Sequence, residues 1–206
     1  MSNSLQNKVI KRNHYKLPSI TPLAERMRPN SLEEYVGQKH LIGEGAVLRG
    51  LIEKGMVPSM ILWGGPGIGK TTLANIISQS TDRPFYTLSA INSGVKDVRE
   101  VIEKAKKQQF FGTNNPILFI DEIHRFSKSQ QDSLLGAVEN GTVTLIGATT
   151  ENPSFEVISA LLSRCQVYIL ESLNKGELMG LLKNAMHKDD LLNSKHIEIK
   201  EEHALL

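Results

Sequence analysis

Short apolar runs alternate with amphipathic segments of helical length through the middle of the chain. The run MILW (60–63) precedes a glycine-rich loop and then KTTLANIISQS, and FYTLSA (85–90) precedes VKDVREVIEKAKK. In the second helical segment, apolar residues recur at spacings of three and four, which places them on one helix face. They are Val95, Val98, Val101, Ile102 and Ala105. The pattern predicts a strand followed by a helix, twice over.

Three later runs have the composition of further strands. They are PILFID (116–121), TVTLIGATT (142–150) and CQVYIL (165–170). PILFID is an unbroken apolar run that ends in an acid, which is typical of a strand buried on both faces of a parallel sheet. Together with the two earlier runs, these predict an α/β fold in which five parallel strands carry helices on both faces.

Two helices are expected between these later strands. The segment SKSQQDSLLGAVENG begins with a capping box, Ser127 with Gln130, and Gly141 is placed to end the helix. A short helix is then expected around 154–163, before the last strand.

The chain changes character at about 171–174, where we expect a boundary. The segment NKGELMGLLKNAMHKDDLL predicts a helix with no strand behind it. The final IEIKEEHALL begins another helix that the end of the sequence interrupts, which suggests a fragment of a longer protein.

The loop after the first strand has the spacing of a phosphate-binding loop. GGPGIGKT matches G-x-x-x-x-G-K-[ST], with an apolar strand before it and a helix after it, a context that disfavours a merely structural glycine turn. Such a loop wraps a polyphosphate with backbone N–H groups, and the next helix directs its positive end at the anion. Lys70 is expected to neutralise the β and γ phosphates, and the Thr71 hydroxyl to ligate Mg²⁺. The expected nucleotide-binding residues are Gly64, Gly65, Pro66, Gly67, Ile68, Gly69, Lys70, Thr71 and Thr72.

Two acids end the third predicted strand, in ILFIDEIH. Asp121 is expected to hold the Mg²⁺ shell, and Glu122 to orient and polarise an attacking water, which favours hydrolysis over transfer to an acceptor. Acids at a strand end are often only solvated loop residues. The phosphate-binding loop about 50 residues earlier makes that alternative the weaker one.

Composition restricts the class of protein without adding a site. The chain has 206 residues, enough for one domain and part of a second, with 40% hydrophobic and 22% charged residues. No apolar run has the length of a membrane span, and the amino terminus lacks the apolar core of a secretory signal, so we expect a cytoplasmic protein without membrane contact. The net charge of +2 neither requires nor excludes DNA.

The motifs resemble those of the AAA+ ATPases. GGPGIGKTT and LFIDEIHRF are similar to Walker A and Walker B of the branch that holds the clamp loaders and the RuvB branch-migration motor. PLAERMRPNSLEEYVGQKHLIG (22–43) resembles the amino-terminal segment of that branch, and LIGATTENPSFEVISALLSRCQVYIL (145–170) resembles the replication-associated recombination protein A family, which includes the Werner-helicase-interacting ATPase. The resemblance runs from about residue 21 to the end of the chain.

This resemblance implies a division of the chain and further site residues. It implies a flexible basic leader at 1–20, an AAA+ core at 21–171, and the truncated start of a helical lid at 172–206. Thr150 corresponds to the sensor-1 position, where the alternative is a threonine that caps a turn. Arg164 corresponds to the arginine finger offered to a neighbouring subunit, where the alternative is a surface salt bridge.

The resemblance also implies which residues contact adenine and which parts of the family's proteins the given sequence does not include. The adenine contacts would come from Val36 and Gly37, with Tyr35 in a short apolar wall near Leu23 and Pro29, although such residues serve as core about as often. The sensor-2 arginine, most of the lid and the oligomerisation region of the family lie beyond residue 206.

Partners and task follow from the resemblance alone. It implies Mg-dependent ATP hydrolysis at stalled replication forks, stimulated by DNA with single-strand/double-strand junctions. It further implies single-stranded DNA-binding protein as a partner, and a homo-oligomer in the full-length protein, with a tetramer as one form. A nucleoid-associated place in the cytoplasm would suit these partners.

Three further residues are of types that often serve in active sites, but we assign them no catalytic or binding role. His124 is expected to be a local hydrogen-bonding group and not the general base. Cys165, the single cysteine, is expected to be a small buried apolar residue, and it allows no intramolecular disulfide. Trp63 is expected in the core.

Two other functions stay open at this level. One keeps the enzyme class and makes the chain a clamp-loader subunit or a branch-migration motor. DEIHR is shared with RuvB, whereas ATTENPSFEVISALLSRC favours the recombination protein. The other is an ATP-gated interaction module without significant turnover, for which neither Glu122 nor Arg164 would be needed.

Overall fold

Five strands form one all-parallel sheet in the order β2-β3-β4-β1-β5. The computed structural model describes residues 21–110 and 114–194. The strands are β1 (Met60–Trp63), β2 (Phe85–Ser89), β3 (Ile117–Asp121), β4 (Thr144–Thr149) and β5 (Gln166–Ile169). The predicted five-stranded parallel sheet is therefore confirmed. The leader at 1–20 and the helix begun in IEIKEEHALL lie outside the described residues.

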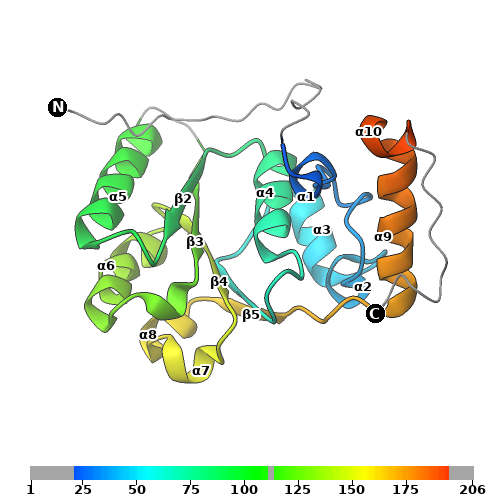
Figure 1. The fold of residues 1–206 in the computed structure, drawn as a ribbon. Helices are drawn as coiled ribbons and strands as arrows, with labels where there is room; N and C mark the ends of the chain where they lie inside the picture. Colours follow the sequence, from blue (N-terminus) through cyan, green and yellow to red (C-terminus); the bar gives the residue numbers. More distant parts are fainter. Residues whose placement is uncertain (1–20, 111–113, 195–206) are drawn as a thin grey trace.

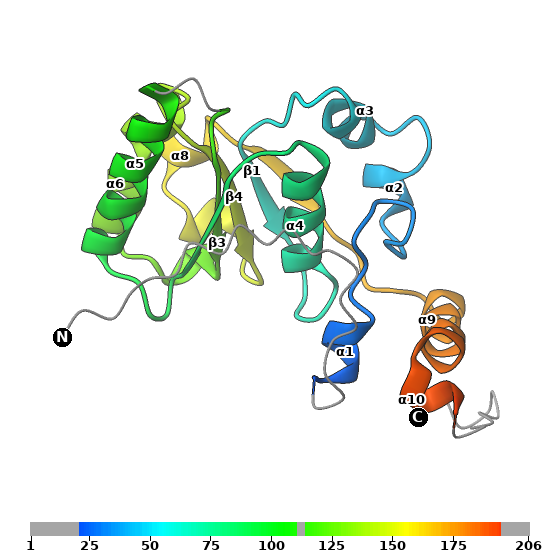
Figure 2. The same ribbon diagram turned by 90° about the horizontal axis from the view of Figure 1, so that it is seen from above.

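Helices cover both faces of this sheet (Figures 1 and 2). On one face lie α3 (Val47–Glu53) and α4 (Lys70–Ser80), and on the other lie α5 (Val95–Phe110) and α6 (Lys128–Glu139). Successive side chains of a strand point to opposite faces. Met60 and Leu62 of β1 accordingly enter the core under α4, and Ile61 enters the core under α5 and α6.

The helix α6 begins and ends where its sequence predicts. The Ser127 hydroxyl accepts from the Gln130 backbone N–H, and the Gln130 side chain accepts from the Ser127 backbone N–H. Gly141 follows the C-cap residue Asn140 with a φ of 64°, a left-handed conformation that suits glycine. These local signals suffice because both caps lie within the segment itself.

The single helix expected around 154–163 is wrong, because two short helices occupy the segment. They are α7 (Pro153–Glu156) and α8 (Ser159–Leu162), separated by extended backbone at Val157 and Ile158. The buried Gln131 of α6 fixes this break. Its amide nitrogen donates to the backbone oxygen of Glu156 at 3.0 Å, and its amide oxygen accepts from the Ile158 N–H at 2.9 Å.

The segment before β1 holds two further short helices, α1 (Leu23–Arg26) and α2 (Lys39–Ile42). After β5 come α9 (Lys175–Lys188) and α10 (Asp190–Asn193), which stand beside α1 and α2 (Figures 1 and 2). The helix expected over this stretch is thus broken at Asp189. That buried carboxylate caps α10 through the Leu192 N–H and pairs with both Nε and Nη2 of Arg26, at 2.6 and 3.0 Å.

A glutamine ties the amino-terminal segment to the end of β5. The amide nitrogen of Gln38 donates to the backbone oxygen of Glu171 at 2.6 Å, and its amide oxygen accepts from the Glu171 N–H at 2.9 Å. His40 contacts the backbone oxygen of Ile169 through Nε2 at 2.9 Å. Side chains from before β1 therefore fix the backbone at the point where the chain leaves the sheet. None of the helices within the described ranges has the length and apolarity to cross a bilayer.

We predict that Gln131→Met lowers the free energy of unfolding by about 1–3 kcal/mol, because it leaves the Ile158 N–H and Glu156 carbonyl without their buried partner. Urea unfolding of the variant and the wild type measures this difference. Gln79→Met, at an exposed position of α4, makes the same chemical change without removing such a contact. Equal stability of Gln131→Met and Gln79→Met would contradict the role assigned to Gln131.

Candidate nucleotide-binding site

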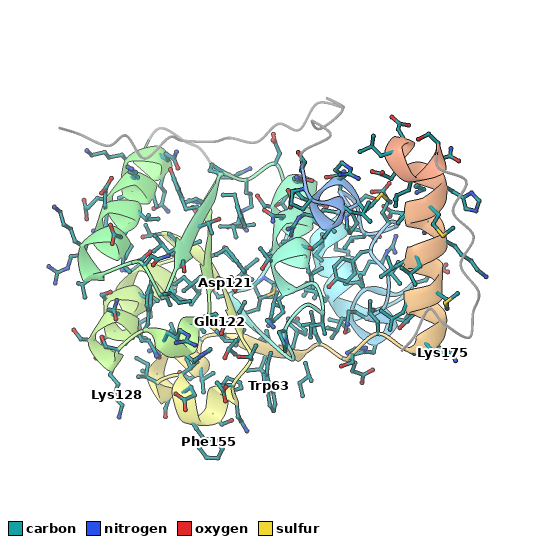
Figure 3. All side chains as sticks on the ribbon, in the orientation of Figure 1. Trp63, Asp121, Glu122, Lys128, Phe155 and Lys175 are labelled. Atoms are coloured by element: carbon teal, nitrogen blue, oxygen red, sulfur yellow. The ribbon has the colours of Figure 1, made fainter. Side chains whose placement is uncertain are left out.

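Three neighbouring strands end at one edge of the sheet and carry most of the predicted site. β3 ends at Asp121, β4 at Thr149 and β1 at Trp63. Trp63 is paired with Thr149 in register, so the loop that follows β1 begins beside the residues that follow β4. Figure 3 labels Asp121, Glu122 and Trp63 along this carboxyl edge. Ligands of open α/β sheets bind at this edge.

The phosphate-binding loop, residues 64–69, is held from behind by a tyrosine. Gly69 has a φ of 101°, and a Cβ atom added to it would lie 2.5 Å from the hydroxyl oxygen of Tyr35. That hydroxyl donates to the backbone oxygen of Ile68 at 3.3 Å, and burial raises the pKa of Tyr35. Only glycine therefore fits at position 69 while Tyr35 stays in place. Directly after it, Lys70 begins α4, whose amino terminus has the positive end of the helix dipole.

Lys70, directly after this loop, is a buried cation. Its Nζ donates to the backbone oxygens of Gly64 and Gly65, at 2.8 and 2.7 Å. Burial lowers the pKa of Lys70, and the charges of Glu122 and Asp121 act in the opposite direction. The two carboxylates thus lie near enough to influence the ammonium group. A polyphosphate placed here would add the anionic partner that a partly desolvated ammonium favours.

Two threonines, Thr71 and Thr72, lie in the first turn of α4, directly after the loop. Thr71 and Asp121 are both half-buried at the carboxyl edge, and they supply a hydroxyl and a carboxylate. Mg²⁺ is usually bound by one or two such protein oxygens together with substrate phosphates, so this donor set fits it. Within the described ranges, no three His, Cys, Asp or Glu side chains gather into a ready-made metal cluster. Thr72 accepts a hydrogen bond from Nη1 of Arg28 at 3.1 Å.

The Glu122 carboxylate is held by two residues, one in the turn after β3 and one directly after β4. Thr150 Oγ1 donates to Glu122 Oε2 at 3.4 Å, and Nδ1 of His124 lies 3.2 Å from the same oxygen. His124 belongs to the short 3₁₀ turn η1 (Ile123–Arg125), and its Nδ1 also lies 3.0 Å from Thr149 Oγ1. Glu122 itself has a φ of 55°, which non-glycine residues seldom adopt. The predicted base and the predicted sensor residue are therefore in contact.

Arg164 is not brought to this site within the chain. It precedes β5, whose first residue Gln166 is paired with Met60 at the start of β1, so Arg164 lies at the amino edge of the sheet. Its guanidinium is exposed and pairs with Glu139 at the end of α6. It also donates to Ser163 Oγ at 2.9 Å. The arginine therefore lies on the surface, with its own phosphate-binding loop at the other end of β1.

Of the residues expected near adenine, Tyr35 contacts the phosphate-binding loop and Gly37 lies against Leu173, beyond the end of β5. Tyr35 is buried behind Gly69, while Val36 and Gly37 are half-buried next to Gln38. Gly37 has a φ of 83°, and a Cβ atom there would lie 2.5 Å from Leu173. Of the more distant candidates, Leu23 is 37% exposed on α1 and Pro29 is half-buried. Sequence reasoning missed Gln38 and Arg28, whose partners Glu171 and Thr72 lie far from them along the chain.

The burial of Cys165 and of Trp63 differs from what the sequence predicts. Cys165 packs against the core under α5 and α6, and burial raises the pKa of its thiol to about 11. Cys165 is half-buried and so meets the expectation of a small apolar residue against the core only in part. The expectation that Trp63 lies in the core is wrong, because this half-buried residue at the carboxyl end of β1 belongs to neither core cluster (Figure 3).

Comparison with known proteins identifies relatives of this chain. Residues 60–173 match the family described as "ATPase family associated with various cellular activities (AAA)". The replication-associated recombination protein A of Coxiella burnetii is 53% identical over 181 residues, which cover 87% of this chain and 40% of that protein. The ATPase WRNIP1 of Dictyostelium discoideum is 46% identical over 198 residues, which cover 96% of this chain and 22% of that protein.

A solved structure has the same arrangement of elements. The RuvB Holliday junction branch migration motor of Thermotoga maritima superposes with a TM-score of 0.68 and 30% identity, over 86% of this chain and 58% of that chain. The match supports the P-loop α/β fold inferred from the sequence. The chain spans about two fifths of the length of the bacterial recombination proteins that it matches.

We predict that Gly69→Ala lowers the free energy of unfolding by about 1–2 kcal/mol or more, the usual cost of a left-handed residue with a Cβ atom. It should also weaken ATP binding, because the new methyl group displaces either Tyr35 or the loop. Urea unfolding and titration with a fluorescent ATP analogue measure the two effects. Gly65→Ala provides the matched control for stability, since a Cβ atom there meets nothing within 4 Å. If both variants unfolded alike, the contact between Tyr35 and the loop would not limit position 69.

Proposed function

Because the chain belongs to the AAA family of ATPases, together with replication-associated recombination protein A and WRNIP1, we propose that it hydrolyses Mg·ATP in DNA replication, recombination and repair at stalled forks. One observation carries the enzymatic part of this proposal. The buried Lys70 directly follows the phosphate-binding loop, and burial lowers the pKa of its ammonium group, whereas the charges of Glu122, which follows β3, and of Asp121, which ends it, raise that pKa. A cation for the phosphates and a carboxylate for water thus share one edge of the sheet.

The loop residues bind and orient the triphosphate. Backbone N–H groups of the loop after Pro66 and the amino terminus of α4 provide donors for phosphate oxygens, whereas the N–H of Gly64 is already bonded to the Thr149 carbonyl. Lys70 exchanges its loop carbonyls for the β and γ phosphates and neutralises their charge. Val36 and Gly37 would contact the adenine, with Tyr35 bracing the loop behind it. Thr71 and Asp121 would hold a Mg²⁺ ion, which would supply positive charge to offset the charge that develops on the phosphate oxygens.

Glu122 is the residue proposed to activate water. Its carboxylate orients the water and takes up its proton as the oxygen attacks the γ-phosphorus, while the bond to the β-phosphate oxygen breaks. Thr150, directly after β4, links Glu122 to the end of that strand through its hydrogen bond to Glu122 Oε2. The products are ADP and phosphate.

Arg164 is proposed to act on the nucleotide of a neighbouring copy. Its exposed guanidinium, at the sheet edge opposite its own loop, is accessible to a second chain. A planar, permanent cation suits the charge that builds up on a transferring phosphoryl group. The catalytic unit is then an interface between subunits of a homo-oligomer, of which a tetramer is one form.

The DNA-related part of the proposal rests on the relatives. We infer that forks and single-strand/double-strand junctions stimulate turnover and that single-stranded DNA-binding protein is a partner, as a nucleoid-associated task would require. Residues 21–171 would form the ATPase core, residues 172–206 the start of a lid, and residues 1–20 a leader. The likeness to the RuvB motor favours one alternative in the same enzyme class, a branch-migration motor.

We predict that Glu122→Gln reduces ATP turnover by ~10²–10⁴, the contribution typical of a positioned general base, and leaves ATP affinity within a few-fold of wild type. Phosphate release, measured with and without forked DNA, gives the turnover, and equilibrium binding gives the affinity. Glu103→Gln, on the outer face of α5, controls for the loss of a carboxylate. Wild-type turnover by Glu122→Gln would overturn the role of Glu122. Tight ATP binding by the assembled wild type without hydrolysis would instead identify an ATP-gated interaction module.

We predict that Arg164→Ala abolishes stimulated turnover and that mixing it with Lys70→Ala restores part of it. In a mixed oligomer, an intact loop of the first variant faces an intact Arg164 of the second. Neither variant alone has such an interface. Glu139→Gln, which removes the ion-pair partner and keeps the arginine, should hydrolyse ATP as wild type does. If the mixture stayed inactive, or if Glu139→Gln lost the same activity, Arg164 would be a structural salt-bridge residue.

A further inference from the structure

One ring nitrogen of His124 connects the Walker B acid to the next strand. The imidazole is 11% exposed, and its Nδ1 lies 3.2 Å from Glu122 Oε2 and 3.0 Å from Thr149 Oγ1. Thr149 is completely buried at the end of β4. A single atom of the histidine, Nδ1, therefore contacts both Glu122, directly after β3, and Thr149, at the end of β4.

The surrounding groups determine which nitrogen carries the proton. A carboxylate accepts hydrogen bonds and donates none. Thr149 Oγ1 donates its one proton to the backbone oxygen of Glu151 at 3.2 Å and accepts from the Glu151 N–H at 3.0 Å. Both neighbours of Nδ1 are thus acceptors toward it. The contacts are favourable only if Nδ1 carries a proton, so a neutral ring has its proton on Nδ1.

The contact acts on one particular oxygen of Glu122. His124 and Thr150 both approach Oε2, so Oε1 is the carboxylate oxygen that these two contacts do not engage. The backbone of Glu122 is left-handed, a conformation that persists only where neighbouring groups hold it. A carboxylate on such a backbone needs an additional restraint if it is to keep one orientation.

We infer that His124 is a positioning residue for Glu122. Its Nδ1–H holds Oε2 against the end of β4, so that Oε1 remains directed to the water it deprotonates. The inference rests on the proposed ATP hydrolysis and adds a residue to it. Thr149 ends β4 and Thr150 follows it directly, so His124, which contacts Thr149, and Thr150 itself restrain the same oxygen from adjacent positions of the chain.

Two substitutions separate positioning from packing. The side-chain amide of His124→Asn keeps a donor close to the place of Nδ1, whereas His124→Leu has comparable bulk and no donor. We predict that His124→Leu lowers kcat by about 10-fold or more, a part of the ~10²–10⁴ supplied by a positioned base, with KM for ATP within about 2-fold. His124→Asn should recover most of the loss. His187→Leu, at an exposed position of α9, is the matched control.

A double variant tests whether the effect passes through Glu122. If it does, adding His124→Leu to Glu122→Gln lowers kcat no further, because the group being positioned is already gone. Equal losses in the presence and absence of Glu122, or a His124→Asn variant as slow as His124→Leu, would overturn the inference. Wild-type turnover by His124→Leu would do so as well and would leave the proposed hydrolysis intact.

The tautomer gives a second test that requires no turnover. Long-range ¹H–¹⁵N correlation spectra of the wild-type chain, recorded at about pH 8, distinguish a protonated Nδ1 from a protonated Nε2. The His124→Asn spectrum assigns the signal by its absence. We expect the proton on Nδ1. A proton on Nε2 alone would overturn the inference, whatever the ATPase assay shows.

Discussion

Parallel pairing of β3, β4 and β1 is the constraint on which the rest of the molecule depends. It brings Asp121, Thr149 and the start of the phosphate-binding loop to one edge, although they come from distant parts of the sequence. Register matters as much as direction, because a slip of one residue turns every side chain of a strand to the opposite face. A shifted β4 would remove Thr149 from His124. Burial of β4 by helices on both faces holds it in register.

The segment before β1 links three parts of the molecule that the sheet alone would leave separate. Tyr35 braces the phosphate-binding loop, Gln38 holds the backbone where β5 ends, and Arg26 pairs with Asp189 between α9 and α10. Each contact joins the amino-terminal segment to a different element. The loop that receives phosphate and the helices after β5 are therefore connected through this segment as well as through the sheet.

Much of the fold follows from local sequence, and the exceptions have distant causes. The strands were predictable because each is a short apolar run bounded by loop residues, and α6 because its caps lie beside it. The break at Val157 and Ile158 was not, since its cause is Gln131 on another helix. The break at Asp189 depends on Arg26, 163 residues earlier in the chain. In the site, motif spacing gave Lys70, Asp121 and Glu122, whereas the contacts of His124 required the register of β4.

In many of the hydrogen bonds that hold these segments together, a side chain of one residue is bonded to backbone atoms of the other. Gln38 binds the peptide of Glu171, Tyr35 the carbonyl of Ile68, and Gln131 the peptides of Glu156 and Ile158. A peptide group is the same whatever side chain it carries. Non-proline substitutions at positions 68, 156, 158 and 171 would therefore leave these bonds intact, whereas substitutions of the side chains of Tyr35, Gln38 and Gln131 would not. Substitution patterns among relatives should accordingly be one-sided, with the side-chain partner invariant and the backbone partner variable.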